Sequence, residues 1–136
     1  MSDYSDPWGP GGKFIEDGLE PVFASDVRGH AFFPAERVME QIPRLYATEN
    51  VDLDDKVVHL HYFVGGCDWY VMELDENRRR AFGYVNLNDE QNAELGYFDM
   101  IELKDTIITP HGREPLVVVE RDLDWTPRMF SEAQAR

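Results

Sequence analysis

The sequence predicts an α+β fold: an antiparallel β-meander of about five strands with two short helices and an irregular N-terminal arm. Three observations predict it. Apolar residues recur with a period of two through the middle of the chain, as in strands. Gly65-Gly66 and the polar stretch 88–92 separate these segments as turns do. Pro34 and Asp99 each precede a short stretch with helical spacing.

The first segment, residues 1–33, is predicted to be an acidic and largely irregular arm. Pro7, Gly9, Pro10, Gly11 and Gly12 interrupt it too often for a helix or a strand. We expect the remaining residues, 34–136, to form the α+β core domain.

The first predicted helix starts at Pro34, because the missing N–H of proline is tolerated in a first turn. Val38, Met39 and Ile42 share one face of this helix, and Pro43 ends it. The second predicted helix is short and follows Asp99, which is a suitable N-cap with Glu102 three residues later.

Five stretches have the pattern of strands. In the first, Val58, Leu60 and Tyr62 share one face, and His59 and His61 share the other. The predicted strands are residues 57–64, 68–74, 80–87, 94–98 and 116–120.

Charge is the strongest global property of the chain. There are 27 acidic and 13 basic residues, for a formal net charge of -14. Binding to nucleic-acid phosphates needs a basic surface, so direct nucleic-acid binding is not expected, and anionic membranes would repel the protein. Acidity can serve solubility alone. It can also form a binding surface for a basic partner, with carboxylates in the places that phosphates would occupy.

Cys67 is the only cysteine, so no intrachain disulfide is possible, as is usual in a reducing cytosol. The neighbouring Asp68 should raise the pKa of its thiol, which argues against a catalytic thiolate. No apolar run reaches about 18 residues. We therefore expect a cytoplasmic protein.

The candidate metal and catalytic residues are weak. His59 and His61 could present two imidazoles to a metal ion, but no third ligand can be assigned from the sequence. Arg78, Arg79 and Arg80 form the one basic run, in an acidic turn that would balance its charge. We predict no metal site, no cofactor and no catalytic residue. The alternative is a small metal-dependent hydrolase or nuclease that uses side chains from the set Glu73, Glu120, Asp122, His59 and His61.

Several stretches, in this order and spacing, carry a family resemblance: residues 43–49 (PRLYATE), 69–75 (WYVMELD), 82–85 (FGYV), 94–98 (ELGYF), 102–103 (EL) and 119–122 (VERD), followed by Trp125 and Pro127. With them, from about residue 42 to residue 131, the chain resembles a bacterial family, domain of unknown function 2958, whose members are often carried by plasmids, phages and integrative elements. The resemblance implies a small accessory protein of a mobile element, and it supplies no catalytic residues.

These observations together predict a small acidic interaction protein. Its partner would be a basic protein, such as a host DNA-binding defence complex that the protein inhibits by DNA mimicry, in the manner of anti-restriction or anti-CRISPR proteins. The predicted contact residues lie in two acidic turns: Asp52, Asp54 and Asp55 in one, and Asp75 and Glu76 in the other.

Overall fold

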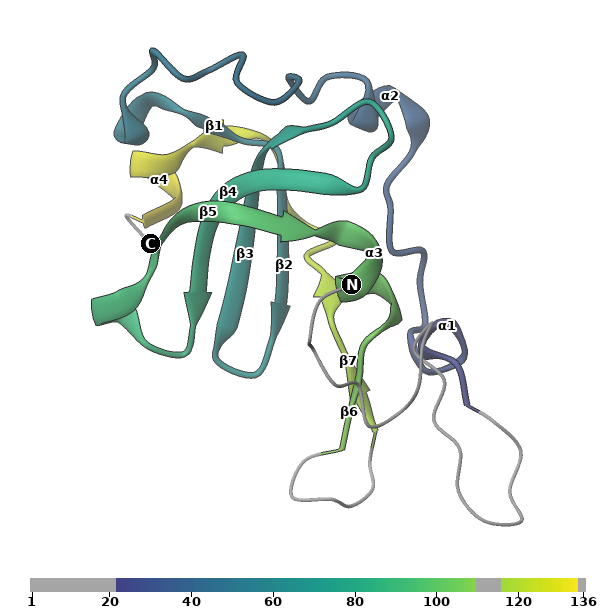
Figure 1. Cartoon of the computed structure of the whole chain (residues 1–136). Coiled ribbons are helices and arrows are strands. Elements are labelled where there is room, and N and C mark those ends of the chain that lie inside the picture. The colour runs from purple at the N-terminus through teal and green to yellow at the C-terminus, as the bar shows by residue number, and fades with distance from the viewer. Residues whose placement is uncertain (1–21, 110–115, 135–136) are drawn as a thin grey trace. The chain divides into compact units, whose positions relative to one another are not determined.

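The structure of the chain is a computed structural model that describes residues 22–109 and 116–134 (Figure 1). The chain divides into two units. Unit 1 is Met1–Phe32 with Ile101–Val119, and unit 2 is Phe33–Met100 with Glu120–Arg136. Residues 1–21 of the predicted irregular arm lie outside the described residues.

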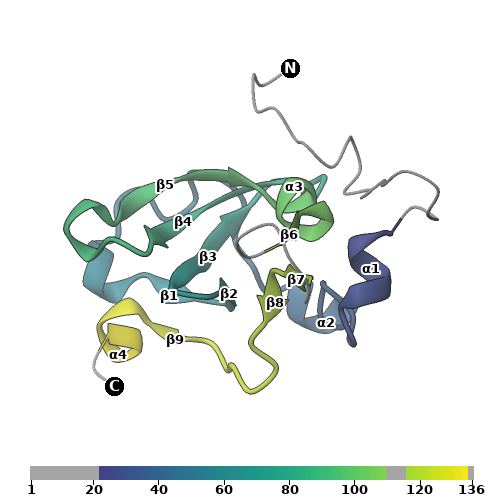
Figure 2. The ribbon, with the colours of Figure 1, turned by 90° about the horizontal axis from the view of Figure 1, so that it is seen from below.

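Unit 2 is built on a five-stranded antiparallel sheet, which confirms the predicted α+β class. The strand order is β5-β4-β3-β2-β8, so four consecutive strands form a meander and β8 adds to one edge. Figure 2 shows the strands in this order, with β5 at the edge opposite to β8. The strands are β2 (Leu60–Val64), β3 (Cys67–Leu74), β4 (Arg80–Leu87), β5 (Glu94–Asp99) and β8 (Glu120–Arg121).

Two predicted strands are each divided in the structure. The stretch 57–64 breaks at His59: β1 (Val57–Val58) pairs with β9 (Arg128–Met129), and β2 begins at Leu60. The stretch 116–120 was also predicted as one strand, which is wrong. Its first part, β7 (Val117–Val118), pairs with β6 (Ile107–Ile108) in unit 1, and β8 pairs with β2. The alternation of apolar residues continues through both breaks. It reflects which side chains are buried, and it does not indicate which strand is the hydrogen-bonding partner.

The helices are short. Pro34 does not open the first predicted helix, because Ala35 has extended backbone angles (φ -58, ψ 153) and the helix α2 is Glu36–Met39. The helix ends before Ile42, yet Met39 and Ile42 are both buried, as the apolar face predicted. The other helices are α1 (Ala24–Val27), α3 (Met100–Asp105), α4 (Phe130–Gln134) and the 3-10 turns η2 (Leu53–Asp55) and η3 (Glu90–Asn92).

Side chains on both faces of the unit 2 sheet are buried, since consecutive residues of β3 from Trp69 to Leu74 are all buried. Val58, Tyr70, Met72 and Phe130 form a buried cluster of this unit. The ring of Phe130, from α4, lies 4.6 Å from that of Tyr84 on β4. Aromatic pairs of this kind add stability beyond the area that they bury.

A register shift in β3 determines which side chains share a face at one end of the sheet. Between Val71 and Glu73 the pairing of β3 with β4 slips, and Glu73 then lies opposite Phe82. Phe82 in turn lies opposite Tyr97 of β5. The bulge thus aligns a carboxylate with two aromatic rings across three strands.

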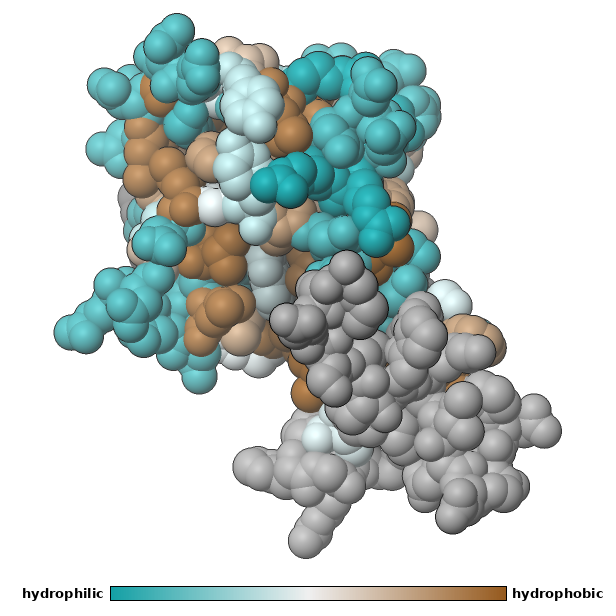
Figure 3. Space-filling model, viewed as in Figure 1, coloured by the Kyte–Doolittle hydropathy of each residue, from teal (hydrophilic) through white to brown (hydrophobic). Residues whose placement is uncertain are grey.

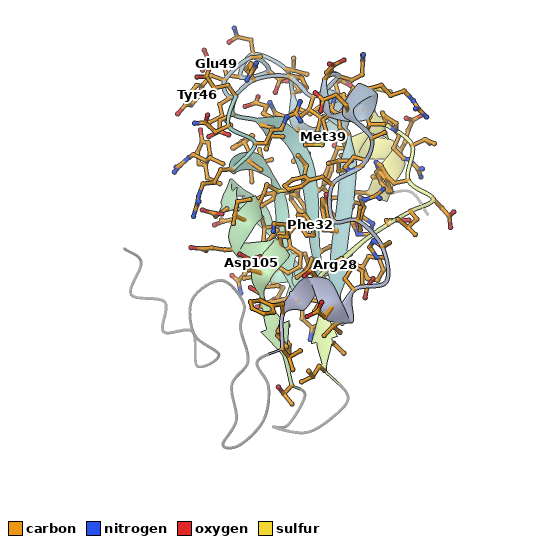
Figure 4. All side chains as sticks on the ribbon, turned by 90° about the vertical axis from the view of Figure 1, so that its right-hand side faces the viewer. Arg28, Phe32, Met39, Tyr46, Glu49 and Asp105 are labelled. Carbon is orange, nitrogen blue, oxygen red and sulfur yellow. The ribbon has the colours of Figure 1, made fainter. Side chains whose placement is uncertain are left out.

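Unit 1 has a smaller core of Ala24, Ile107 and Val118. Arg28 is also buried there. Its Nε donates to Val119 O at 2.9 Å, and its Nη2 donates to Lys104 O at 2.9 Å. Figure 4 labels Arg28 in this unit. Because these bonds join the chain before and after the central sheet, Arg28 holds unit 1 together. None of the described helices is long and apolar enough to cross a membrane.

Candidate functional site

The first predicted acidic turn contains the 3-10 turn η2. Asp52, Asp54 and Asp55 are exposed, while Leu53 packs against the core cluster. Lys56 follows directly but is only 5% exposed. Its Nζ donates to the carbonyl oxygen of Thr48 and, at 3.0 Å, to Thr48 Oγ1. The cation nearest in sequence therefore points into the protein, and three carboxylates face solvent.

The second predicted acidic turn has a different environment. The carboxylate of Asp75 accepts a hydrogen bond from the backbone N–H of Arg79 at 2.9 Å. Arg79 Nε is 2.8 Å from Asp99 Oδ2. Glu76 is exposed. Half of this turn's carboxylate pair is thus used to shape the turn, and a cation of the basic run lies beside it.

Arg78 accounts for another member of the basic run. It has a left-handed backbone (φ 59), and its side chain makes two hydrogen bonds to the carboxylate of Glu36. These bonds lower the pKa of Glu36. Arg78 and Arg79 are therefore paired with carboxylates, whereas the guanidinium of Arg80 lies 4.5 Å from the ring centroid of Tyr97.

Glu73 is buried (2% exposed) and holds the loop that precedes η2. Its carboxylate accepts from the backbone N–H of Tyr46 at 2.7 Å and of Thr48 at 3.0 Å, and from the Thr48 hydroxyl. Lys56 reaches the same threonine. A carboxylate with these bonds is a structural acceptor, which explains Glu73 without any catalytic role.

Tyr46, which donates its backbone N–H to Glu73, has an unusual backbone conformation and an exposed side chain. The residue has a positive φ of 74°, which a tyrosine rarely adopts, and its side chain is 59% exposed. Its ring lies 6.3 Å from the ring of Tyr97, itself 42% exposed. Figure 4 labels Tyr46 near Glu49 at one end of the view.

His61 lies between two carboxylates. Its Nε2 is 2.7 Å from Asp68 Oδ1, and its Nδ1 is 3.0 Å from Asp122 Oδ2. The imidazole is buried and stacks on Tyr70, with centroids 4.7 Å apart. This triad joins β2, β3 and the segment after β8. This triad was not predicted, because nothing in the sequence spacing of Asp68 and Asp122 points to one histidine.

His59 is separated from His61 by its position at the strand break. Burial lowers its pKa. Its Nδ1 is buried and has no hydrogen-bond partner within the described part of the chain. The residue lines a hollow of about 570 Å³, together with Asp122, Trp125 and other mainly apolar side chains.

A metal-dependent hydrolase or nuclease would need three or more of the five candidate residues in one hollow. Of these, His59 and Asp122 line the 570 Å³ hollow, whereas Glu73 is bound to the loop. Within residues 22–109 and 116–134, no group of three or more histidine, cysteine or carboxylate side chains is placed to hold a metal ion. The convergence that the enzyme alternative needs is not seen in the described residues.

Cys67 is partly buried at the start of β3. Burial raises the pKa of its thiol, and the charge of Asp68 raises it further. The sequence predicted this direction from the carboxylate alone, and burial is the larger cause. A thiol with a raised pKa is a poor nucleophile at neutral pH.

By its fold and these sites, the protein is a small α+β domain with a meander sheet and an acidic turn that faces solvent. The family model of the protein of unknown function DUF2958 matches residues 35–132. The chain therefore belongs to the DUF2958 family. No curated protein and no solved structure is significantly similar to it.

Proposed function

We propose that the protein is a small acidic interaction protein that binds a basic protein partner. The observation that carries the proposal is the η2 turn, in which Asp52, Asp54 and Asp55 are exposed and Lys56 is buried. In a chain of net charge -14, this turn concentrates negative charge on an ordered segment. Such a surface accelerates encounter with a positively charged partner.

The proposed partner is a DNA-binding enzyme of a host defence system, and the protein acts for a phage or plasmid. The carboxylates would occupy the groove that holds DNA phosphates, in the way that an anti-restriction or anti-CRISPR protein acts. The net charge and the resemblance to mobile-element proteins support this proposal. Asp75 and Glu76 contribute less than η2, since Asp75 is hydrogen-bonded within its own turn.

The test is capture of partners by the tagged full chain from a lysate of a bacterial host, at about 50 mM and then about 500 mM salt. We expect a basic DNA-binding protein to be retained at low salt and lost at high salt. The variant Asp52→Asn/Asp54→Asn/Asp55→Asn should weaken its binding by at least about tenfold.

A matched control removes three exposed carboxylates elsewhere: Asp26→Asn/Glu40→Gln/Asp124→Asn. It changes the net charge by the same amount, so any larger loss in the η2 variant belongs to that turn. Equal losses in both variants would show only general charge attraction, and no partner at either salt concentration would reject the proposal.

A further inference from the structure

β5 is an outer strand with an open side. It pairs with β4 over its whole length, and no strand pairs with its other side among the residues that the structure describes. β8, at the opposite edge, has only two residues. Six residues of edge strand are enough for another chain to extend the sheet.

The hydrogen bonding shows which backbone groups point outward. The Met100 N–H donates to Arg79 O at 2.7 Å, and Arg80 lies opposite Asp99. Because hydrogen-bonded and non-hydrogen-bonded pairs alternate in an antiparallel ladder, the N–H and C=O groups of Leu95 and Tyr97 face away from β4. These groups are the ones that an added strand would bind.

The first half of β5 is acidic, whereas two arginines lie at its end: Arg79 Nε is 2.8 Å from Asp99 Oδ2, and the guanidinium of Arg80 lies 4.5 Å from the ring centroid of Tyr97. From Ala81 to Leu103 there is no further lysine or arginine, and this stretch contains five carboxylates. Glu90 and Glu94 are exposed. Edge strands are commonly protected by lysine, proline or bulges, and β5 has neither lysine nor proline. A second copy of this chain would bring the same negative charges together, so the strand is complementary to a basic segment.

A hollow beside the start of β5 has the same character. Its volume is about 450 Å³, and it is lined by Asp68, Tyr84, Asn86 and Glu90, with no basic side chain among the described residues that line it. Hydrogen-bond acceptors and aromatic rings together suit a guanidinium or ammonium group.

Two exposed rings stand at the other end of β5. Tyr97 projects from the strand itself, and Tyr46 is held beside it by the buried carboxylate of Glu73. A tyrosine at φ 74° is strained, yet its side chain is exposed and adds little to the core. Figure 3 shows apolar side chains across the middle of this face, with hydrophilic ones on both sides.

We propose that the outer edge of β5, with Tyr46 and Tyr97, binds an extended basic segment of the partner by strand addition. The backbone of Leu95 and Tyr97 supplies the hydrogen bonds. Because Arg80 of the chain itself lies over the ring of Tyr97, the ring of Tyr46 receives an arginine or lysine side chain of the partner, and Glu90 and Glu94 select for positive charge. The inference rests on the proposed function in taking the partner to be basic, and it adds the surface and the mode of binding.

The probe is a capped peptide of about eight residues in which arginine and valine alternate, a composition that favours an extended strand. It is titrated into the ¹⁵N-labelled full chain and followed by NMR. We expect the shifted amides to cluster at residues 94–99, with slower hydrogen exchange at Leu95 and Tyr97. The same peptide with alternate backbone nitrogens methylated keeps its charge but loses its donors, and should bind at least about tenfold more weakly.

Side-chain variants test the rings. Tyr46→Ala/Tyr97→Ala should weaken the peptide by about three- to tenfold, whereas Leu87→Ala, at a 62% exposed residue, should change nothing. Equal binding of both peptides, or shifts spread over all acidic turns, would overturn the inference, as would an absence of binding.

The two proposals fail in different ways. If the partner captured from a lysate is unaffected by Tyr46→Ala/Tyr97→Ala but lost with the η2 variant, strand addition at β5 is wrong and the acidic-turn proposal stands. If no partner is captured but the peptide binds β5, the acidic-turn proposal is wrong and strand addition at β5 stands.

Discussion

His59 is the residue whose surroundings give the clearest dependence on pH. Burial lowers its pKa in the folded protein below the ordinary value of 6.5. The unfolded chain therefore binds more protons as the pH falls below 6.5. The stability that comes from keeping His59 neutral is fully present above that value and is lost as the pH falls toward the lowered one.

We expect His59→Gln to remove this dependence. Between pH 7.5 and pH 5.5, the wild type should lose up to about 1 kcal/mol more of its free energy of unfolding than the variant loses. Urea unfolding at both pH values measures the difference. The two proteins should have the same m-value at pH 7.5, and equal pH slopes would show that His59 is hydrated in the folded state.

Single residues also show the limit of the sequence. The raised pKa of Cys67 was predictable from its neighbour Asp68. The positive φ of Tyr46 was not, because it depends on Glu73, a residue 27 positions away. Tyr46 and Glu73 both lie in stretches that carry the family resemblance, but that resemblance does not predict the hydrogen bond between them.

At the scale of elements, the close approach of β3 and β4 leaves no room for a side chain at one position of the sheet. Gly83 lies opposite Val71, and a Cβ added at Gly83 would overlap the carbonyl oxygen of Tyr70. Gly96 lies opposite Gly83 on β5, and a Cβ added there would meet nothing within 4 Å. The pair offers a matched comparison within one row of the sheet.

Gly83→Ala should therefore destabilise the protein by about 3 kcal/mol or more, because the backbone carbonyl cannot move without breaking the β3–β4 ladder. Gly96→Ala should change the free energy of unfolding by less than about 1 kcal/mol. Urea unfolding of both variants is the measurement. A similar cost at the two positions would mean that the strands are further apart than the structure has them.

Helices, strands and turns could be predicted where neighbouring residues determine them, and could not where a distant segment does. The hairpin at Gly65 was predicted because a glycine pair is a local signal, and Gly65 has the positive φ of 55° that such a turn uses. The division of residues 116–120 between two sheets was not predicted, since alternation does not name a partner strand. Two-residue strands such as β6 are too short to give a pattern at all.

For the whole molecule, the acidic balance affects stability as well as binding. Of the lysine and arginine side chains described above, Lys56 and Arg28 are buried, Arg78 is paired with Glu36, Arg79 is paired with Asp99, and Arg80 lies over the ring of Tyr97. Many exposed carboxylates thus face solvent in a chain of net charge -14, and their mutual repulsion opposes the compact state. The same property that would attract a basic partner lowers the stability of the free protein.

We therefore expect salt to stabilise the protein. Raising NaCl from about 20 to about 200 mM shortens the screening length severalfold and should raise the melting temperature by about 3 °C, measured by circular dichroism. The variant Asp52→Asn/Asp54→Asn/Asp55→Asn carries less negative charge, so its increase should be smaller and its melting temperature at low salt higher. A wild-type melting temperature that falls or stays constant with salt would show that ion pairs, which salt weakens, outweigh the repulsion. The acidic surface would then be compensated within the molecule, and the electrostatic basis of the proposed function would be lost.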